Sequence, residues 1–305
     1  DREGLVEIAR WELPLKNPVL IEADGEDLWV LCMGDIRRDA QGLFYVAEPG
    51  GLVRLKGAAG ELQAEPEIQG FALEPGGSPG SWAWLPERRE VVLGSSIVPE
   101  LYVFDLENRQ WKRDSANPVE QPETEGDETL SVISHPDGHI GVLSFARNSA
   151  RLVDAEHYEN VDGTEEVSLA VGSELEGPLS GVFVLEDDVP VAYVVLSLSN
   201  SLARWVPGAP EATEPRFRQL GLTPNQIVAN DSMLFIVESG DNVLSMHPRA
   251  GGEPVEVVFP VGTNPYSAAV SVDGTVVYVT GLLSNSIFEV DVESAQILGQ
   301  GPVKP

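Results

Sequence analysis

The sequence has little of what disulfide-rich, membrane-spanning and metal-dependent proteins need. Its 305 residues include one cysteine, Cys32, and four histidines. A single cysteine cannot form a disulfide within the chain, and its apolar neighbours predict a buried side chain. No apolar run approaches the roughly 18 residues of a membrane-spanning helix, and helical periodicity is absent over any useful length. The motifs HExxH and CxxC and the EF-hand loop are also absent, which argues against zinc and calcium sites of those kinds.

Positive charge is scarce as well. The chain carries 19 basic and 49 acidic residues, a formal net charge of −30. A surface this negative repels phosphate backbones and anionic lipid head groups, so nucleic-acid binding is excluded. Three causes would explain the acidic excess: solubility in a saline habitat, binding of divalent cations, or a basic partner.

A short pattern recurs along the second half of the chain. An aromatic residue in an apolar run is followed seven residues later by Asn. Tyr193 and Asn200, Phe235 and Asn242, and Tyr278 and Asn285 form three copies, and Gly141 with Asn148 forms a fourth. The asparagines are spaced 52, 42 and 43 residues apart. A repeat of this length with several short strands predicts a β-propeller. We expect the three aromatic residues to occupy equivalent buried positions and the asparagines to be turn residues.

The clearest unit, Asn264–Gly299, predicts four antiparallel strands that make one blade. Asp273-Gly274 is typical of the turn between its first two strands, and Thr275–Thr280 is a β-branched, aromatic strand. The same pattern predicts five further units: Gly221–Gly252, Gly177–Pro210, Thr129–Asp154, Gly80–Trp111 and Leu28–Leu62. In the last of these, the run FYVAEPGGLVRL from Phe44 predicts a pair of strands.

Residues Leu5–Ala23 predict two more strands outside these units. We therefore predict an all-β, single-domain β-propeller over residues 1–305, with six whole blades and part of a seventh built from the N-terminus. The alternative is a six-bladed ring with an extra N-terminal hairpin. Ser115–Thr129 is polar and acidic and indicates an exposed loop. Glu156–Glu176 is also acidic, but contains the sequence EEVSLAVG, which favours an outer strand.

The unit from Val261 resembles the YVTN β-propeller repeat. The resemblance rests on Gly-x-Asn-Pro before the first strand, Asp-Gly at the turn, Tyr278-Val279-Thr280 in the second strand, and Asp291 after the third. Gly281 stands where that repeat usually has Asn. The resemblance implies a seven-bladed, extracytoplasmic protein. Such families include surface proteins, partner-binding scaffolds, lactonase-like enzymes and the large subunits of quinoprotein amine dehydrogenases, so the repeat indicates a fold and not an activity.

The candidate metal ligands are the acids Glu186, Asp187, Asp188 and Asp231. They fall in corresponding turns of successive units, and calcium takes six to eight oxygen ligands. If the turns face one another, their carboxylates could share a Ca²⁺ ion. The alternative is that they are solvated turn residues. The sequence offers no catalytic or cofactor-binding residue.

Three other groups of residues have structural explanations. His135 and His139 flank the Asp137-Gly138 turn, which favours a solvated turn over a metal pair. Ser78 lies in a G-x-S-x-G match, but a nucleophile elbow needs a strand before it and a helix after it, and prolines bracket this serine. Trp82 and Trp84 share a strand face by alternation and should pack between blades.

These observations predict a non-catalytic propeller that binds a protein partner or builds a surface assembly. One alternative is an enzyme of the lactonase or lyase kind, for which a histidine and two or more acids should converge near the propeller axis. The other is a redox-complex subunit with a small cysteine-rich partner. The chain begins with Asp1 and not Met, which is typical of a processed or trimmed product. We expect a bacterial, extracytoplasmic protein, and a lipid anchor upstream of Asp1 would be consistent with that location.

Overall fold

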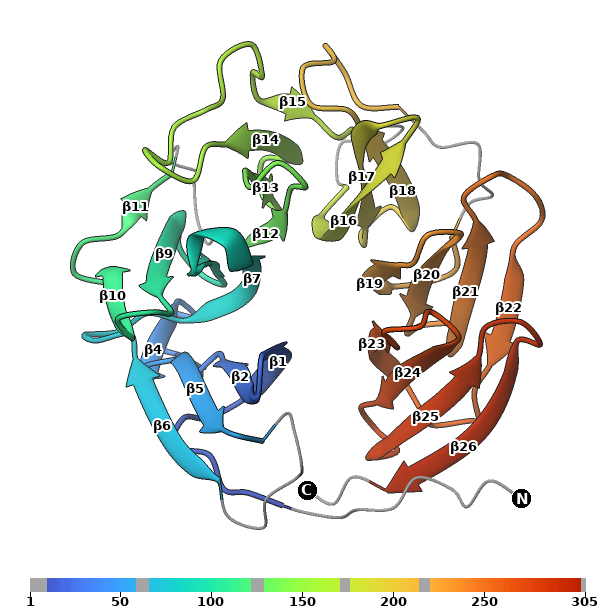
Figure 1. Cartoon of the computed structure of the whole chain (residues 1–305), viewed down its shortest axis with the longest axis horizontal. Helices are drawn as coiled ribbons and strands as arrows, with labels where there is room; N and C mark the ends of the chain where they lie inside the picture. The colour runs from blue at the N-terminus through green and yellow to red at the C-terminus, as the bar shows by residue number, and fades with distance from the viewer. Residues whose placement is uncertain (1–9, 59–65, 122–128, 171–175, 214–219, 303–305) are drawn as a thin grey trace. The chain divides into compact units, whose positions relative to one another are not determined.

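The computed structural model describes residues 10–58, 66–121, 129–170, 176–213 and 220–302. Over these ranges the chain is an all-β β-propeller with six antiparallel blades (Figure 1). Its helical content is one three-residue 3₁₀ turn, η1 (Pro86–Arg88). In this part of the chain, no helix has the length and apolar character needed to cross a membrane.

The chain divides into two compact units. The N-terminal unit comprises Ala9–Arg147 and Arg151–Asp162, and the C-terminal unit comprises Asn148–Ala150 and Gly163–Pro305. A single domain over residues 1–305 stays a prediction.

The first three blades have the strand orders β1-β2-β5-β6, β10-β9-β8-β7 and β12-β13-β14-β15, with β11 paired to β9. A separate two-stranded sheet, β3-β4, lies between β2 and β5 in the sequence. The bounds are β1 (Pro18–Asp24), β2 (Asp27–Cys32), β3 (Asp35–Arg38), β4 (Phe44–Glu48), β5 (Gly51–Lys56), β6 (Glu67–Ala72), β7 (Pro79–Leu85), β8 (Glu90–Ser95), β9 (Glu100–Asp105), β10 (Gln110–Arg113), β11 (Val119–Glu120), β12 (Leu130–Ser134), β13 (Ile140–Ser144), β14 (Ser149–Val153) and β15 (Val167–Ser168).

The last three blades have the orders β16-β17-β18, β19-β20-β21-β22 and β23-β24-β25-β26. The first strands of these blades adjoin, with β16 beside β19 and β19 beside β23 (Figure 1). The bounds are β16 (Pro178–Glu186), β17 (Val189–Leu196), β18 (Ser201–Trp205), β19 (Pro224–Ala229), β20 (Met233–Glu238), β21 (Val243–Pro248), β22 (Val255–Val258), β23 (Pro265–Val270), β24 (Val276–Gly281), β25 (Ser286–Asp291) and β26 (Gln296–Pro302).

The first strands share a local signal. Five of the six begin with proline: Pro18, Pro79, Pro178, Pro224 and Pro265. In each of these strands the pairing with the second strand shifts directly after the proline. The remaining first strand, β12, begins with Leu130 and pairs without a shift. Proline has no N–H to give to the ladder, so a bulge forms where a hydrogen bond would stand. We call this end of each blade the proline end.

The core lies between adjacent blades. Trp29, Leu52 and Phe104 belong to one buried cluster shared by the first and second blades. Phe235 and Phe288 belong to another, shared by the fifth and sixth. In the second blade, β8 is buried on both faces, because Val91 and Leu93 pack towards the first blade and Val92 packs towards the third. Trp82 and Trp84 pack against the first cluster with ring centroids 5.5 Å apart, which confirms their interpretation as inter-blade residues.

The structure corrects the N-terminal assignment. Residues Pro18–Asp24 are the first strand of the first blade, not part of a seventh. Phe44–Glu48 pairs with Asp35–Arg38 in the separate hairpin and not with Gly51–Lys56. The sequence is misleading here because β4 has strand composition but is mostly exposed. Six blades are present in the described residues, and a seventh is not confirmed.

Other expectations have mixed outcomes. Tyr193, Phe235 and Tyr278 all lie in the second strands of their blades. Tyr193 and Phe235 are buried, but Tyr278 is only half-buried, so that part of the prediction is wrong. The acidic insertion does contain an outer strand, β15. Ser115–Thr129 includes the short strand β11, and its residues 122–128 lie outside the described part.

Candidate functional site

Glu186, the first candidate metal ligand, is paired with two side chains of its own blade. It ends β16, and its carboxylate accepts hydrogen bonds from Tyr193 and from Arg204, whose Nη2 lies 2.7 Å from Oε2. Burial by itself would raise the pKa of Glu186, but these hydrogen bonds hold it below its ordinary value. The charge of this carboxylate is therefore already compensated by Arg204.

The other three candidates lie at exposed turns. Asp187 and Asp188 both have positive φ, 49° and 65°, as a tight hairpin turn requires. Asp231 lies in the corresponding turn of the next blade. The Arg249 guanidinium lies between the two turns: its Nη1 donates to the Asp231 carbonyl at 2.8 Å, and its Nη2 donates to the Leu185 carbonyl. The cation that joins these turns is thus a side chain of the protein.

The described residues contain no group of three or more His, Cys, Asp or Glu side chains placed to hold a metal ion. A calcium site at Glu186, Asp187, Asp188 and Asp231 stays a prediction. Arg204 would have to leave the Glu186 carboxylate for that carboxylate to bind a cation.

Ser78 has the structural role expected of it, and the two histidines flank a turn as expected, but His135 is buried, so the prediction of a solvated turn is wrong for that residue. Ser78 is buried, and its hydroxyl donates to the Met33 carbonyl at 2.9 Å. His135 is buried at the β12–β13 turn, its Nδ1 accepts the Asp137 N–H at 3.2 Å, and burial lowers its pKa. The His139 ring lies 5.8 Å from it, centroid to centroid.

A buried polar chain in the fifth blade had no sequence signal. The Ser245 hydroxyl donates to Glu238 Oε1 at 2.6 Å, and His247 Nε2 lies 3.0 Å from the same hydroxyl. All three side chains are buried. Burial raises the pKa of Glu238 and lowers the pKa of His247 to about 4. Both groups are therefore held towards their neutral forms inside a blade.

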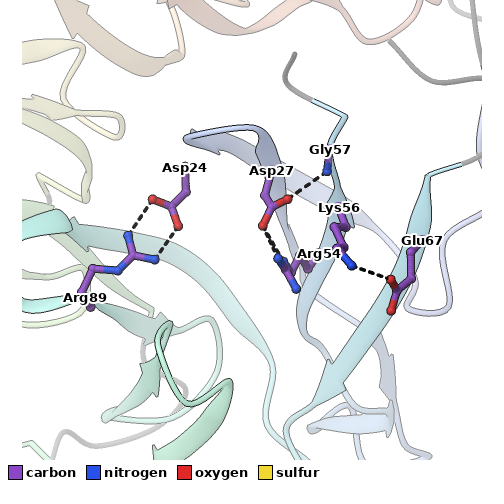
Figure 2. Close-up of polar contacts among 7 residues, drawn as sticks. All are labelled: Asp24, Asp27, Arg54, Lys56, Gly57, Glu67 and Arg89. Atoms are coloured by element: carbon purple, nitrogen blue, oxygen red, sulfur yellow. Dashed lines mark hydrogen bonds and ion pairs between the residues drawn. The ribbon is translucent and has the colours of Figure 1, made fainter. Parts of the chain in front are cut away.

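Ion pairs join neighbouring segments of the first two blades at the end opposite the proline end (Figure 2). Asp24, at the end of β1, binds Arg89 through two parallel contacts of 2.6 and 2.7 Å. Asp27, at the start of β2, accepts the Gly57 N–H at 2.8 Å and pairs with Arg54. The hydrogen bond from Arg89 is the largest of the effects that lower the pKa of Asp24. Asp24 and Arg89 stand 65 positions apart, so no local pattern could reveal their pairing.

At the proline end, the turn between the second and third strands is bonded to the chain entering the same blade. Three backbone hydrogen bonds of 2.9 to 3.0 Å show this in the C-terminal unit: the N–H groups of Leu198, Gly240 and Leu282 donate to the carbonyls of Glu176, Leu222 and Asn264, respectively. Because the bond recurs in each of these blades, turns and incoming loops form one continuous rim at this end.

The repeated asparagines connect successive blades along this rim. Asn200 and Asn242 have φ of 53° and 62°. The Asn200 side-chain oxygen accepts the Thr223 N–H at 2.8 Å, and that of Asn242 accepts the Asn264 N–H at 3.0 Å. Each asparagine therefore adopts a left-handed turn conformation and also holds the loop that enters the next blade.

The rim of the C-terminal unit exposes large apolar side chains. We call this set the apolar surface: Leu198, Leu222, Val261, Tyr266, Leu282 and Leu283. Each is more than half exposed, and Val261 is completely so. The asparagine links join the loops that carry these side chains, because Thr223 follows Leu222 and Asn264 lies between Val261 and Tyr266. Asp241 is the exposed acid among the described rim loops, and it accepts the Leu222 N–H at 2.7 Å.

Sequence reasoning missed this surface, although two signals mark it. Proline at the start of a first strand locates the rim, and the residues just before each repeated asparagine form its turns. Leu198, Leu282 and Leu283 all fall in that window. Apolar residues in a turn are unusual because turns are normally solvated.

Comparison with known proteins supports the fold alone. No family model matches the sequence, so the YVTN resemblance is not confirmed. No curated protein matches it either. The structure is similar to virginiamycin B lyase from Staphylococcus aureus, at 14% identity, 95% coverage of this chain and 85% of that one, and a TM-score of 0.71.

Two further solved structures are similar. A catalytically inactive variant of the S. aureus lyase with quinupristin is 15% identical, with coverage of 94% and 85% and a TM-score of 0.69. A functionally unknown protein from Desulfotomaculum acetoxidans is 13% identical, with coverage of 93% and 85% and a TM-score of 0.65. The chain thus has the fold of the lyase propellers, which by itself does not assign an activity.

Proposed function

We propose that this protein is a non-catalytic scaffold that binds a protein partner or assembles with itself through the apolar surface of its C-terminal unit. The observation that carries the proposal is the exposure of six large apolar side chains on one end of three successive blades. Exposed apolar groups of this extent mark interaction sites on soluble proteins.

The distribution of charge supports the same proposal. The opposite ends of these three blades carry the exposed acids Asp187, Asp188, Asp231, Glu253, Asp273 and Glu293. In the described loops that carry the apolar surface, Asp241 is the one exposed acid. Depletion of charge in the centre and enrichment of apolar and aromatic residues are typical of protein interfaces.

The histidines support a non-catalytic role. All four lie in the described residues. His135 and His247 are buried, and His139 lies at a turn. His157 lies at an exposed turn, with its Nδ1 atom 3.4 Å from Oδ1 of Asp154. None of them stands with two acids at an accessible position on a first strand, which is the arrangement that a lyase-like site would need.

A lyase-like activity is the second candidate, and the similarity to virginiamycin B lyase favours it. The direct test is to incubate the protein with quinupristin and follow substrate and product by chromatography with fragmentation mass spectrometry, because an elimination that opens a ring leaves the total mass unchanged. Turnover that survives purification would support the lyase and overturn the non-catalytic proposal. An unchanged substrate would agree with the scaffold.

An extracytoplasmic location and a bacterial source are part of the proposal. They rest on the resemblance of the last repeat to YVTN propellers, which are mostly extracytoplasmic. Fractionation of the source cells, with an antibody to the purified chain, tests both. Recovery in the cytoplasm would contradict the location.

Binding is tested by photo-crosslinking. A photoreactive residue replaces Leu283 on the apolar surface or, as the control, Val272, which is fully exposed at the opposite end of the same blade. Each protein is irradiated in extract of the source organism. We expect a discrete protein adduct from position 283 and none from 272, and loss of that adduct when Leu282→Ser is added. Equal adducts from both positions would refute the surface.

A further inference from the structure

We infer that the apolar surface binds a second copy of this chain, face to face, so that the proline ends of two C-terminal units meet. This inference rests on the proposed function, because it names the occupant of the same surface. It makes the protein a symmetric dimer in which each copy uses the same residues.

The size of the surface fits such an interface. Val261 is completely exposed, Leu283 is 69% exposed, and the other four side chains are just over half exposed. Six side chains of this kind present on the order of 700 Å² of surface, close to the roughly 800 Å² per partner of a stable interface. A patch of this size is also at or above the upper range of the largest patch on a typical monomer, roughly 600 Å².

Electrostatics selects a second copy over a partner of opposite charge. A basic protein would be drawn to the end that carries Asp187, Asp188, Asp231 and Asp273, away from the apolar surface. A copy of this chain carries the same net charge of −30 and can approach only where charge is sparse. The apolar surface meets that condition because Asp241 is its one exposed acid in the described loops.

The distances make the repulsion within such a dimer small. A six-residue strand such as β20 or β24 is about 20 Å long, so the acidic ends of two copies meeting at their proline ends would lie about 40 Å apart. The Debye length at physiological ionic strength is about 8 Å, so these charges are screened from one another.

Tyr266, Leu282 and Leu283 are the side chains of this interface that the sixth blade contributes. Thr263 and Asn264, which precede Tyr266, accept the Leu283 and Leu282 N–H groups at 3.2 and 2.9 Å. The loop and the turn are therefore fixed against each other before association. Rigid aromatic and leucine side chains on a fixed backbone lose little entropy on binding.

Sedimentation velocity of the purified chain over a wide concentration range, at low and at high NaCl, tests the inference. We expect the sedimenting mass to rise from that of one chain to that of two. Association should be retained or strengthened as NaCl rises, because screening reduces repulsion and leaves apolar contact intact.

The decisive variant carries Leu282→Ser and Leu283→Ser, and the matched control carries Leu185→Ser and Val272→Ser at the opposite end. All four side chains are exposed, so neither variant should lower the melting temperature appreciably. We expect the first variant to remain monomeric at concentrations tenfold above those at which wild type and control dimerise.

Two results would overturn the inference. One is a wild-type chain that stays monomeric under all conditions. If crosslinking at position 283 then captured a different protein, the proposed function would stand and only the second copy would be wrong. The other is a dimer that survives Leu282→Ser with Leu283→Ser, which would place the contact elsewhere.

Discussion

Replacing Asn242 tests whether the repeated asparagines hold one blade to the next. The Asn242 side chain makes three hydrogen bonds: it accepts the Asn264 N–H at 3.0 Å and donates to the carbonyls of Phe259 and Pro260 at 2.7 and 2.9 Å. Its backbone has a φ of 62°. Asn242→Ala removes all three bonds and places a side chain with Cβ in the left-handed region.

The two effects can be separated by magnitude. Three partly exposed hydrogen bonds, at about 0.5 kcal/mol each, contribute about 1.5 kcal/mol. An alanine in the left-handed conformation adds about 1 kcal/mol. We therefore expect Asn242→Ala to lower the free energy of unfolding by about 2.5 kcal/mol. Asn242→Gly keeps the left-handed turn at no steric cost and should lower it by about 1.5 kcal/mol.

Asn285 is the matched control. It has the same conformation, with a φ of 47°, but no side-chain hydrogen bond of Asn285 is found among the described residues. We therefore expect Asn285→Ala to lower the free energy of unfolding by about 1 kcal/mol, from the left-handed backbone conformation alone.

Urea unfolding followed by tryptophan fluorescence and by circular dichroism measures all three variants, and coincident transitions justify a two-state fit. Equal destabilisation by Asn242→Ala and Asn285→Ala would refute the linking role. So would Asn242→Gly with wild-type stability.

Three further predictions follow from the charged groups. Asp24→Asn should lower the free energy of unfolding by about 1 kcal/mol at pH 7. Because Arg89 depresses the pKa of Asp24 in the folded state, the difference from wild type should vanish as the pH falls well below 3.8. A difference that persists in acid would contradict this. The pKa of His247 is about 4 in the folded protein and 6.5 for an ordinary histidine, so the wild type loses stability as the pH falls from 6.5 to about 4. His247→Gln should remove about 2 kcal/mol of that loss at pH 5. An unchanged dependence of stability on pH would refute this. The melting temperature should rise with NaCl as the Debye length shrinks from about 30 Å at 0.01 M to about 3 Å at 1 M. CaCl₂ at matched ionic strength should raise the melting temperature by the same amount, because Arg204 and Arg249 occupy the oxygens near Glu186. A larger rise with CaCl₂ would indicate a calcium site.

Local patterns in the sequence were sufficient for the all-β class and for most blade boundaries. Alternating strands, Asp273-Gly274 at a hairpin turn and asparagine at a fixed offset from an aromatic residue are consequences of short-range sterics and hydrogen bonding, which act within a few residues. These features needed no knowledge of distant contacts. The same reasoning went wrong at Phe44–Glu48, where strand composition does not specify a partner.

The candidate site depended on contacts between distant residues, which only the tertiary structure provides. Asp187, Asp188 and Asp231 lie in turns as predicted, but Glu186 ends a strand, and its pairing with Arg204 could not be read from the sequence. The apolar surface required knowing that Leu198, Leu222 and Leu283, from three different blades, emerge at the same end. Strand direction fixes which loops share an end, and burial by neighbouring blades fixes which apolar residues remain exposed. Both are properties of packing between blades, so the repeat alone determined the fold and the tertiary structure decided the binding surface.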